Sequence, residues 1–314
     1  MFAPTSDDPA TPAEPARWRR WAWLLPPVAV GVFLRLFRLG TQILVGDELH
    51  APRAAQRHDL ETVLTTFLPS DHSMPLTGLY ELLMESGVEL TELHLRLPVL
   101  VAAMLVLVVV PVALERRLGR GAAVAAAWLV AVSPGLVLYG RIARSYMPMV
   151  LLAFVAARAF ERWWRTRRAG AAVAYAASGA AAAWFHLGAA PFVAAPLLWG
   201  GLAALRRPPR LRRLAEVAVA GAGLAAGFAA FLLPAWESFV GMFGEKSGHG
   251  LPSWLGAGEV ALAFAGVAEP WAGLVFWAFA GAGLAVLARR RPAFATFSLL
   301  LVAVHLAATL AMRP

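Results

Sequence analysis

Long apolar runs separated by shorter polar connections fill the chain from residue 21 onward. The runs match the roughly 20 residues that a helix needs to cross the hydrocarbon core of a bilayer. The pattern predicts an all-α polytopic membrane protein with about nine transmembrane helices in a single domain, residues 21–314. The predicted spans are residues 21–39, 95–114, 122–139, 145–160, 169–187, 189–205, 214–235, 271–288 and 293–311.

The N-terminal segment, residues 1–20, is expected to be disordered and cytoplasmic, because it is rich in Pro, Ala and Asp and ends in basic residues. Basic residues followed by an apolar run also fit a cleaved signal peptide. The run is long for that reading, no small-x-small site follows it, and Arg35 and Arg38 lie at its far end. An uncleaved first span is therefore favoured.

Two polar connections are long, residues 40–94 and 236–270. Helical spacing within the first predicts two amphipathic helices, at residues 50–67 and 75–90, lying in the headgroup plane at the outer face. The second of these helices is expected to carry Leu76, Leu79, Tyr80, Leu83 and Met84 on one face, with Glu81 and Glu85 turned away. The other connection holds the only lysine, Lys246, in a glycine-rich segment that either orders over a ligand or is an ordinary solvated loop.

Composition strengthens the membrane assignment. The chain is 60% hydrophobic and 15% charged, whereas soluble domains are about 45–50% apolar and about 25% charged. It contains no cysteine, which excludes disulfides, thiolate metal sites and a cysteine nucleophile.

The net charge of +9 reflects membrane topology and does not indicate a nucleic-acid partner. Basic residues gather in alternate connections, as the positive-inside rule requires. These connections carry Arg116, Arg117 and Arg120, then Arg162, Arg165, Arg167 and Arg168, then Arg206, Arg207, Arg210, Arg212 and Arg213, and finally Arg289, Arg290 and Arg291. The first long connection instead carries nine acidic residues, among them Asp47 and Glu48. This asymmetry places the acidic loop and the C-terminus outside and the N-terminus in the cytoplasm.

Arg141 and Arg144 fall on the predicted outer side, where few basic residues are expected. Residues three apart project from one face of a helical turn, so the pair is predicted to hold a phosphate by charge-assisted hydrogen bonds. Two alternatives remain open: the arginines reach lipid headgroups, or they neutralise Asp47 and Glu48.

Five short motifs in order give the chain a family resemblance. They are LRLFRLG at residues 34–40, DE at 47–48, HSMPL at 72–76, LRLP at 95–98 and RIARSY at 141–146. This series resembles family 39-type glycosyltransferases of the GT-C superfamily, the group of protein O-mannosyltransferases and aminoarabinose transferases. The match ends near Trp184-Phe185-His186.

The resemblance implies a GT-C-like transmembrane domain in a bacterial inner membrane, surrounded by membrane lipids. It implies inverting transfer of a sugar from a polyprenyl-phosphate donor to an acceptor that is a glycan, a lipid or a protein, at the extracytoplasmic face. Asp47 and Glu48 are the predicted catalytic residues: Asp47 matches the catalytic base, and Glu48 matches a neighbour that positions the acceptor or a divalent ion. Arg144 and Tyr146 match the donor phosphate site of the family, and Arg141 joins them as a phosphate-binding candidate because of its spacing to Arg144. The further candidate substrate-binding residues are His72, Pro75, Tyr80, Arg96, His186 and Lys246.

Two departures from the family pattern concern the acceptor side. Val45-Gly46 replaces the aromatic residue that commonly precedes Asp-Glu, and Ser73-Met74 stands beside Pro75 in place of a second proline or polar residue. The chain is also short for the family. It is expected to be either a compact member or part of a longer product.

A divalent metal ion is a further candidate partner. Asp47 and His50 are three residues apart, so they can meet on one helical turn, and Glu48, His50 and His72 offer oxygen and imidazole ligands for Zn²⁺, Mn²⁺ or Mg²⁺. The alternative is that these are ordinary polar loop residues.

Two other functional classes stay open beside the transferase. One is a transporter or flippase for a lipid-linked substrate, in which the acidic loop gates and the outer arginines recognise an anion. The absence of a visible repeat and the gathering of polar candidates at one interface favour the enzyme. The other class is a membrane scaffold without catalytic activity.

Overall fold

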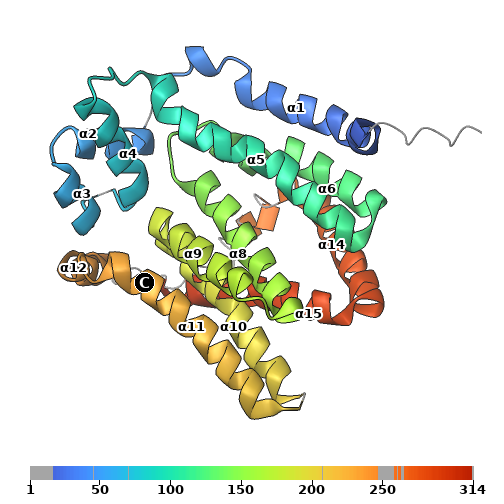
Figure 1. Ribbon diagram of the computed structural model, residues 1–314. Coiled ribbons are helices and arrows are strands. Elements are labelled where there is room, and N and C mark those ends of the chain that lie inside the picture. Colours follow the sequence, from blue (N-terminus) through green and yellow to red (C-terminus); the bar gives the residue numbers. More distant parts are fainter. Residues whose placement is uncertain are drawn as a thin grey trace, which may run out of the picture.

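The computed structural model describes residues 17–44, 46–69, 71–206, 208–246, 258–259, 261–262 and 265–312, and these residues form helices and turns without a β-strand. The all-α prediction is confirmed for this part of the chain. The helices form two bundles that share α8 (Tyr146–Thr166), with a group of short helices at one end (Figure 1).

In the first bundle, α1 (Leu25–Leu36) and α6 (Arg120–Val132) pack against each other and against α5 (Glu92–Leu118), and α5 packs against α8. Its buried core is aliphatic and is centred on α5, and it contains Val99, Ala103, Val106, Leu107, Ala131 and Met147. The start of α5 is fixed by a capping box, in which the Thr91 hydroxyl accepts from the His94 amide and the His94 ring accepts from the Thr91 amide. Helix α5 therefore begins at a defined residue directly beside the candidate site.

In the second bundle, α8 packs against α9 (Ala169–Phe185) and α10 (Ala190–Leu205). Helix α11 (Arg210–Leu232) packs against α9 and α10, and α15 (Pro292–Met312) packs against α10. Many of its core positions are alanines, which allow helices to approach closely, around a central group of aromatic rings. Helix α14 (Pro270–Arg290) lies at the edge of this bundle against α15.

Short helices cover one end of the two bundles (Figure 1). They are η2 (Leu39–Thr41), η3 (Gly46–Leu49), α2 (His50–Ala55), α3 (Leu60–Thr65), α4 (Met74–Glu85), α7 (Pro134–Tyr139), η4 (Leu187–Ala189) and α12 (Trp236–Lys246). The backbone amide of Phe67 donates to the Ser238 hydroxyl at 2.9 Å. This bond joins the two long polar connections of the sequence.

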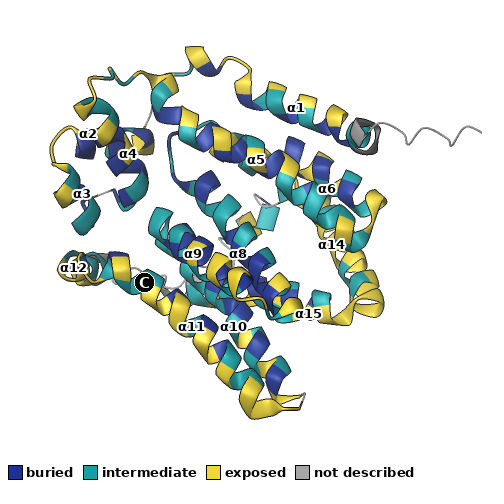
Figure 2. Cartoon of the chain, in the orientation of Figure 1, coloured by how far each residue is buried: buried dark blue, intermediate teal, exposed yellow. Residues whose placement is uncertain are grey.

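Five helical stretches among the described residues are long and apolar enough to cross a membrane. They are Trp21–Thr41, Glu92–Leu118, Leu187–Leu205, Arg210–Leu232 and Pro270–Arg290. Their outward faces are apolar, and exposed positions run along α11 and α14 (Figure 2), including Val219, Leu274 and Phe279. Such extended exposed apolar surface is typical of a protein surrounded by lipid. These features are consistent with an integral membrane protein.

The other four predicted spans do not meet the same criteria. The apolar parts of α6, α9 and α15 are shorter, and α8 carries Arg158, Glu161 and Arg162 near its end. Charged side chains are costly in hydrocarbon, so they shorten the part of α8 that suits the bilayer interior. The number nine therefore stays a prediction.

The predicted division of α4 into an apolar and a polar face is partly wrong. Leu76 and Tyr80 are buried, but Leu79 of the same predicted face is exposed, and Glu81, which was predicted to turn away, is buried. Helix α4 packs against both α2 and α3, so its contact surface is wider than one apolar stripe and includes the carboxylate. Burial of Glu81, together with the charges of Glu85 and Asp59, raises the pKa of its carboxyl group.

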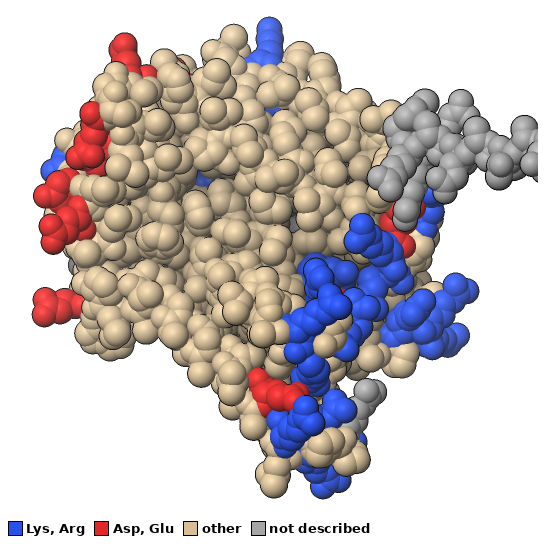
Figure 3. Space-filling model, viewed as in Figure 1, with Lys and Arg blue, Asp and Glu red and all other residues tan. Residues whose placement is uncertain are grey.

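Charged residues gather at opposite ends of the molecule (Figure 3). The acidic end comprises η3 and α2 to α4 with the start of α5, and it carries most of the acidic residues in the described part of the chain. The basic end comprises the α5–α6, α8–α9, α10–α11 and α14–α15 connections, where the described arginines that were predicted to face the cytoplasm lie. The helices thus bring the four basic connections together, as the alternating pattern of the sequence predicted.

Candidate active site at the acidic end

The Asp47-Glu48 pair lies in η3, a single turn that follows Gly46 in a left-handed conformation (φ 51°). Consecutive residues in such a turn point in different directions. The side chain of Asp47 is 68% exposed, whereas that of Glu48 is 2% exposed. Two adjacent carboxylates therefore have different surroundings and different capabilities.

Glu48 forms a buried two-point ion pair with Arg96 of α5. The Arg96 Nε lies 3.0 Å from Glu48 Oε1, and its Nη2 lies 3.1 Å from Oε2. Glu48 Oε1 also accepts from the Ala143 backbone amide at 2.8 Å. Planar, paired hydrogen bonds of this kind fix both side chains in one geometry. The pair holds η3 against α5 and against the α7–α8 connection.

Arg96 was predicted to bind substrate, but it uses its remaining donors on the backbone. It donates to the carbonyl oxygens of Leu39 at 3.2 Å, Gln42 at 2.6 Å and Ile43 at 3.1 Å. Its guanidinium is thus saturated by Glu48 and by the segment that leads out of α1. In this structure Arg96 holds η3 and the segment after α1 in place.

Asp47 lies against the α7–α8 connection, where it meets Arg144, 97 residues later in the sequence. Its Oδ2 lies 3.9 Å from Nη2 of Arg144, and its backbone carbonyl accepts from Arg144 Nη1 at 3.3 Å. His50 Nε2 lies 3.7 Å from Asp47 Oδ1, as the three-residue spacing predicted. An exposed carboxylate, a guanidinium and an imidazole therefore meet at one surface, which we call the Asp47 site.

The prediction that Arg141 and Arg144 project from one helical face is wrong, because residues 140–145 form a turn and not a helix. Arg141 donates to the Leu34 carbonyl at 2.7 Å and to the Gln42 side chain at 3.3 Å. It caps the end of α1, whereas Arg144 points to Asp47. The structure therefore leaves Arg144 as the arginine of the Asp47 site.

Aromatic side chains continue the site from Arg144 along the start of α8. The Tyr146 ring packs edge-on against Tyr139, with centroids 4.6 Å apart, and lies 5.2 Å from the His186 ring. His186 Nδ1 in turn accepts from the Gly188 amide at 3.1 Å. Two of the predicted substrate-binding residues, Tyr146 and His186, are thus in contact.

The remaining candidates have other surroundings. Tyr80 is fully buried and donates to the Leu95 carbonyl at 2.5 Å, and burial, with the charges of Asp71 and Glu48, raises the pKa of its hydroxyl. Pro75 lies in the first turn of α4, where its fixed φ suits a helix start. His72 lies beside the Phe67 ring, at 6.2 Å between centroids. Lys246 ends α12, and its side chain lies outside the described part of the chain.

The predicted metal ligands are not assembled in this structure. In the part of the chain that is described, no group of three or more His, Asp or Glu side chains is placed to hold a metal ion. Both oxygens of Glu48 are bound by Arg96. His50, one of the three proposed ligands, lies 3.7 Å from the Asp47 carboxylate.

Sequence reasoning assigned no site role to Arg35 or Asp71. Arg35 is buried in α1 and donates to the Val130 and Ala131 carbonyls at 3.0 and 3.1 Å. Val130 would normally receive the amide four residues later, but that residue is Pro134, which has no N–H. Arg35 supplies the missing donor. Asp71 accepts from the Thr77 hydroxyl at 2.5 Å. An arginine inside the apolar first span was the available signal for Arg35.

Comparison of the chain with models of protein families, with curated proteins and with solved structures found no match.

Proposed function

We propose that the chain is an inverting glycosyltransferase that moves a sugar from a polyprenyl-phosphate donor to an acceptor hydroxyl at the Asp47 site. The observation that supports this most is the meeting of an exposed carboxylate, Asp47, with the guanidinium of Arg144 from a distant segment. The motif series described above names the same two residues. In this proposal the acidic end faces the extracytoplasmic side of a bacterial inner membrane.

The proposed reaction needs one base and one anion-binding group. Asp47 accepts the proton of the acceptor hydroxyl while the oxygen of that hydroxyl bonds to the anomeric carbon of the sugar. The bond between that carbon and the phosphate oxygen breaks, and its electron pair leaves with the polyprenyl phosphate. Arg144 stabilises the charge that develops on this leaving group. Attack opposite to the leaving group inverts the anomeric centre.

The buried residues give this chemistry a fixed frame. Glu48 joins Arg96 on α5 to the Ala143 amide, one residue before Arg144. Asp47 therefore lies next to the carboxylate residue itself, and Arg144 lies next to Ala143, whose amide that carboxylate binds. This arrangement makes Glu48 a positioning residue in the proposal and leaves Asp47 available to the acceptor.

The test is a transfer assay with a radiolabelled polyprenyl-phosphate sugar and purified full-length protein, in which the labelled product is identified. Asp47→Asn removes the base with little change in volume, and we expect turnover to fall by about 10²–10⁴-fold. Asp59→Asn, an exposed carboxylate at the same end, is the matched control and should keep its activity. Undiminished turnover in Asp47→Asn refutes the assignment of the base. Movement of labelled lipid across the bilayer without a glycosylated product would instead identify a flippase.

A further inference from the structure

A cavity of about 810 Å³ lies at the basic end, on the opposite side of the molecule from the Asp47 site. It is formed by α8, α10 and the α14–α15 connection, with Arg117 from the end of α5. Four segments far apart in the sequence therefore build its walls. Its volume lies within the range of about 300–1,000 Å³ that is typical of small-molecule sites.

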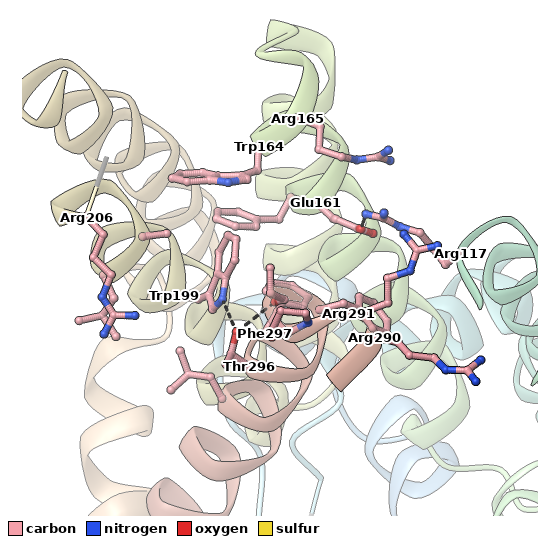
Figure 4. A pocket seen from close by; sticks show the side chains of 17 residues that line it. Arg117, Glu161, Trp164, Arg165, Trp199, Arg206, Arg290, Arg291, Thr296 and Phe297 are labelled. Atoms are coloured by element: carbon pink, nitrogen blue, oxygen red, sulfur yellow. Dashed lines mark hydrogen bonds and ion pairs between the residues drawn. The ribbon is translucent and has the colours of Figure 1, made fainter. Parts of the chain in front are cut away.

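Aromatic rings form the inner wall of this cavity (Figure 4). Trp199 lies edge-on to Trp164 at 5.3 Å between centroids and edge-on to Phe297 at 5.4 Å. Phe297 stacks on Phe160 at 6.2 Å. The Trp199 Nε1 donates to the Thr296 hydroxyl at 3.5 Å. The wall is thus apolar and is held by contacts between three helices.

Arginines surround the aromatic wall. Figure 4 shows Arg206 on one side of the rings and Arg117, Arg165 and Arg290 on the other, and Arg291 also lines the cavity. Glu161 is the single acidic residue among the lining side chains, and it is already paired with Arg117 and Arg158. The cavity therefore carries a large excess of positive charge beside an apolar surface.

The cavity also borders the surface that faces lipid. Leu202 of α10 lines it and is at the same time one of the exposed large apolar side chains. A ligand held there would touch arginine on one side and hydrocarbon on the other. A soluble anion uses only the first of these surfaces, whereas an amphiphile uses both.

We propose that this cavity binds the headgroup and the first part of the acyl chains of an anionic glycerophospholipid. Arginine forks match phosphate oxygens in pairs, and basic pockets between transmembrane helices are suited to acidic headgroups. Positive charge in the connections alone sets topology, but topology does not require the arginines to converge on an aromatic cavity. The site is independent of sugar transfer and does not rest on the proposed function.

The experiment measures lipid binding by the purified full-length chain in detergent with native mass spectrometry. The probes are phosphatidylglycerol, phosphatidylcholine and soluble glycerol phosphate. We expect the chain to bind phosphatidylglycerol about tenfold more tightly than phosphatidylcholine, and glycerol phosphate to compete only weakly. The double variant Arg206→Gln with Arg291→Gln should lose this preference for phosphatidylglycerol.

The matched control is Arg162→Gln with Arg168→Gln, which removes the same charge from the same end outside the cavity lining. It should keep the preference. An equal loss in both double variants would overturn the proposal, because it would show attraction to the basic end as a whole. Equal binding of the two lipids overturns it as well. Displacement of phosphatidylglycerol by an equal concentration of glycerol phosphate would show a phosphate site without a lipid occupant.

A second variant covers the case in which loss of two arginines disturbs folding. Ala203→Phe narrows the cavity from α10 and keeps every charge. It should abolish the preference for phosphatidylglycerol while the helical circular dichroism stays unchanged. Retention of the full preference in a folded Ala203→Phe protein contradicts binding inside the cavity.

Discussion

The acidic end and the basic end use charge in opposite ways. At the acidic end, the buried carboxylate of Glu48 meets a guanidinium atom for atom, and the remaining donors of Arg96 are taken by backbone carbonyls. At the basic end, five arginines line a cavity that contains one carboxylate. The first arrangement pairs each charge with an opposite one. The second has more arginines than carboxylates.

The difference separates charges that hold the fold from charges that are available to a ligand. A saturated buried pair fixes the relative positions of the segments that carry it, although its net effect on stability is small compared with an apolar replacement. Arg35 also joins two helices of the fold, because its guanidinium donates to the carbonyls that end α6. Exposed excess charge has no such partners and can bind a phosphate. Asp47 and Arg144 lie between the two cases.

The largest expected effect comes from breaking the saturated pair on one side only. Arg96→Met leaves the Glu48 carboxylate buried without its counter-charge, and we expect a loss of about 3–5 kcal/mol in the free energy of unfolding. Denaturant unfolding of the detergent-solubilised protein, followed by circular dichroism, measures this loss. Transfer activity should fall as well, because η3 loses its hold on α5.

Two controls test whether pairing is the cause. Arg165→Gln removes an exposed arginine at the basic end and should change the free energy of unfolding by less than about 0.5 kcal/mol. Adding Glu48→Leu to Arg96→Met removes the stranded carboxylate and should recover most of the lost stability. If Arg96→Met were no more destabilising than Arg165→Gln, the contrast between the two ends would not hold.

Local and periodic features of this fold were readable from the sequence. The apolar runs predicted helices, alternate basic connections predicted one basic end, and the spacing of Asp47 and His50 predicted their contact. Each of these depends on residues close together in the chain or on average composition. Those are the properties that helix geometry and membrane solvation determine directly.

The distant pairings were not readable in the same way. Arg96 was assigned to substrate because an arginine in a motif does not reveal that Glu48, 48 residues earlier, will take its guanidinium. Arg141 was assigned to phosphate because the turn at residues 140–145 was treated as helical. Glu81 was placed on the polar face because helical spacing gave α4 one apolar face, whereas the helix packs against both α2 and α3. In all three cases tertiary packing decided the outcome.

A smaller effect, on donor binding alone, is expected for Arg144, which is neither in a saturated buried pair nor in the basic cavity. Arg144 is 19% exposed and its partner Asp47 is 68% exposed, so the pair contributes at most about 1 kcal/mol to folding. Arg144→Gln should therefore leave unfolding almost unchanged. It should weaken binding of the polyprenyl-phosphate donor by roughly tenfold, since a charged hydrogen bond to phosphate is lost.

Arg141→Gln, three residues away, should have the opposite effects on stability and donor affinity. Its donors serve Leu34 and Gln42, so we expect lower stability and an unchanged donor affinity in folded protein. Donor binding is measured by equilibrium dialysis with labelled lipid in the same detergent as the unfolding experiment. Donor affinity that depends on Arg141 and is indifferent to Arg144 would reverse the assignment of the two arginines.

The smallest effect concerns an exposed carboxylate that is bound to backbone and has no arginine partner. Hydrogen bonds from the hydroxyl and the backbone amide of Thr62 lower the pKa of Asp59 at the start of α3, and the amide lies 2.8 Å from Oδ1. A carboxyl group whose pKa is lower in the folded state stabilises the fold above its unfolded pKa of about 3.9. This stabilisation disappears as the pH falls through the lower, folded value.

Asp59→Asn keeps an N-cap residue but removes the titration. The difference in melting temperature between wild type and Asp59→Asn should therefore shrink as the pH is lowered through this range, and a constant difference would show that the Thr62 contacts do not favour the charged form.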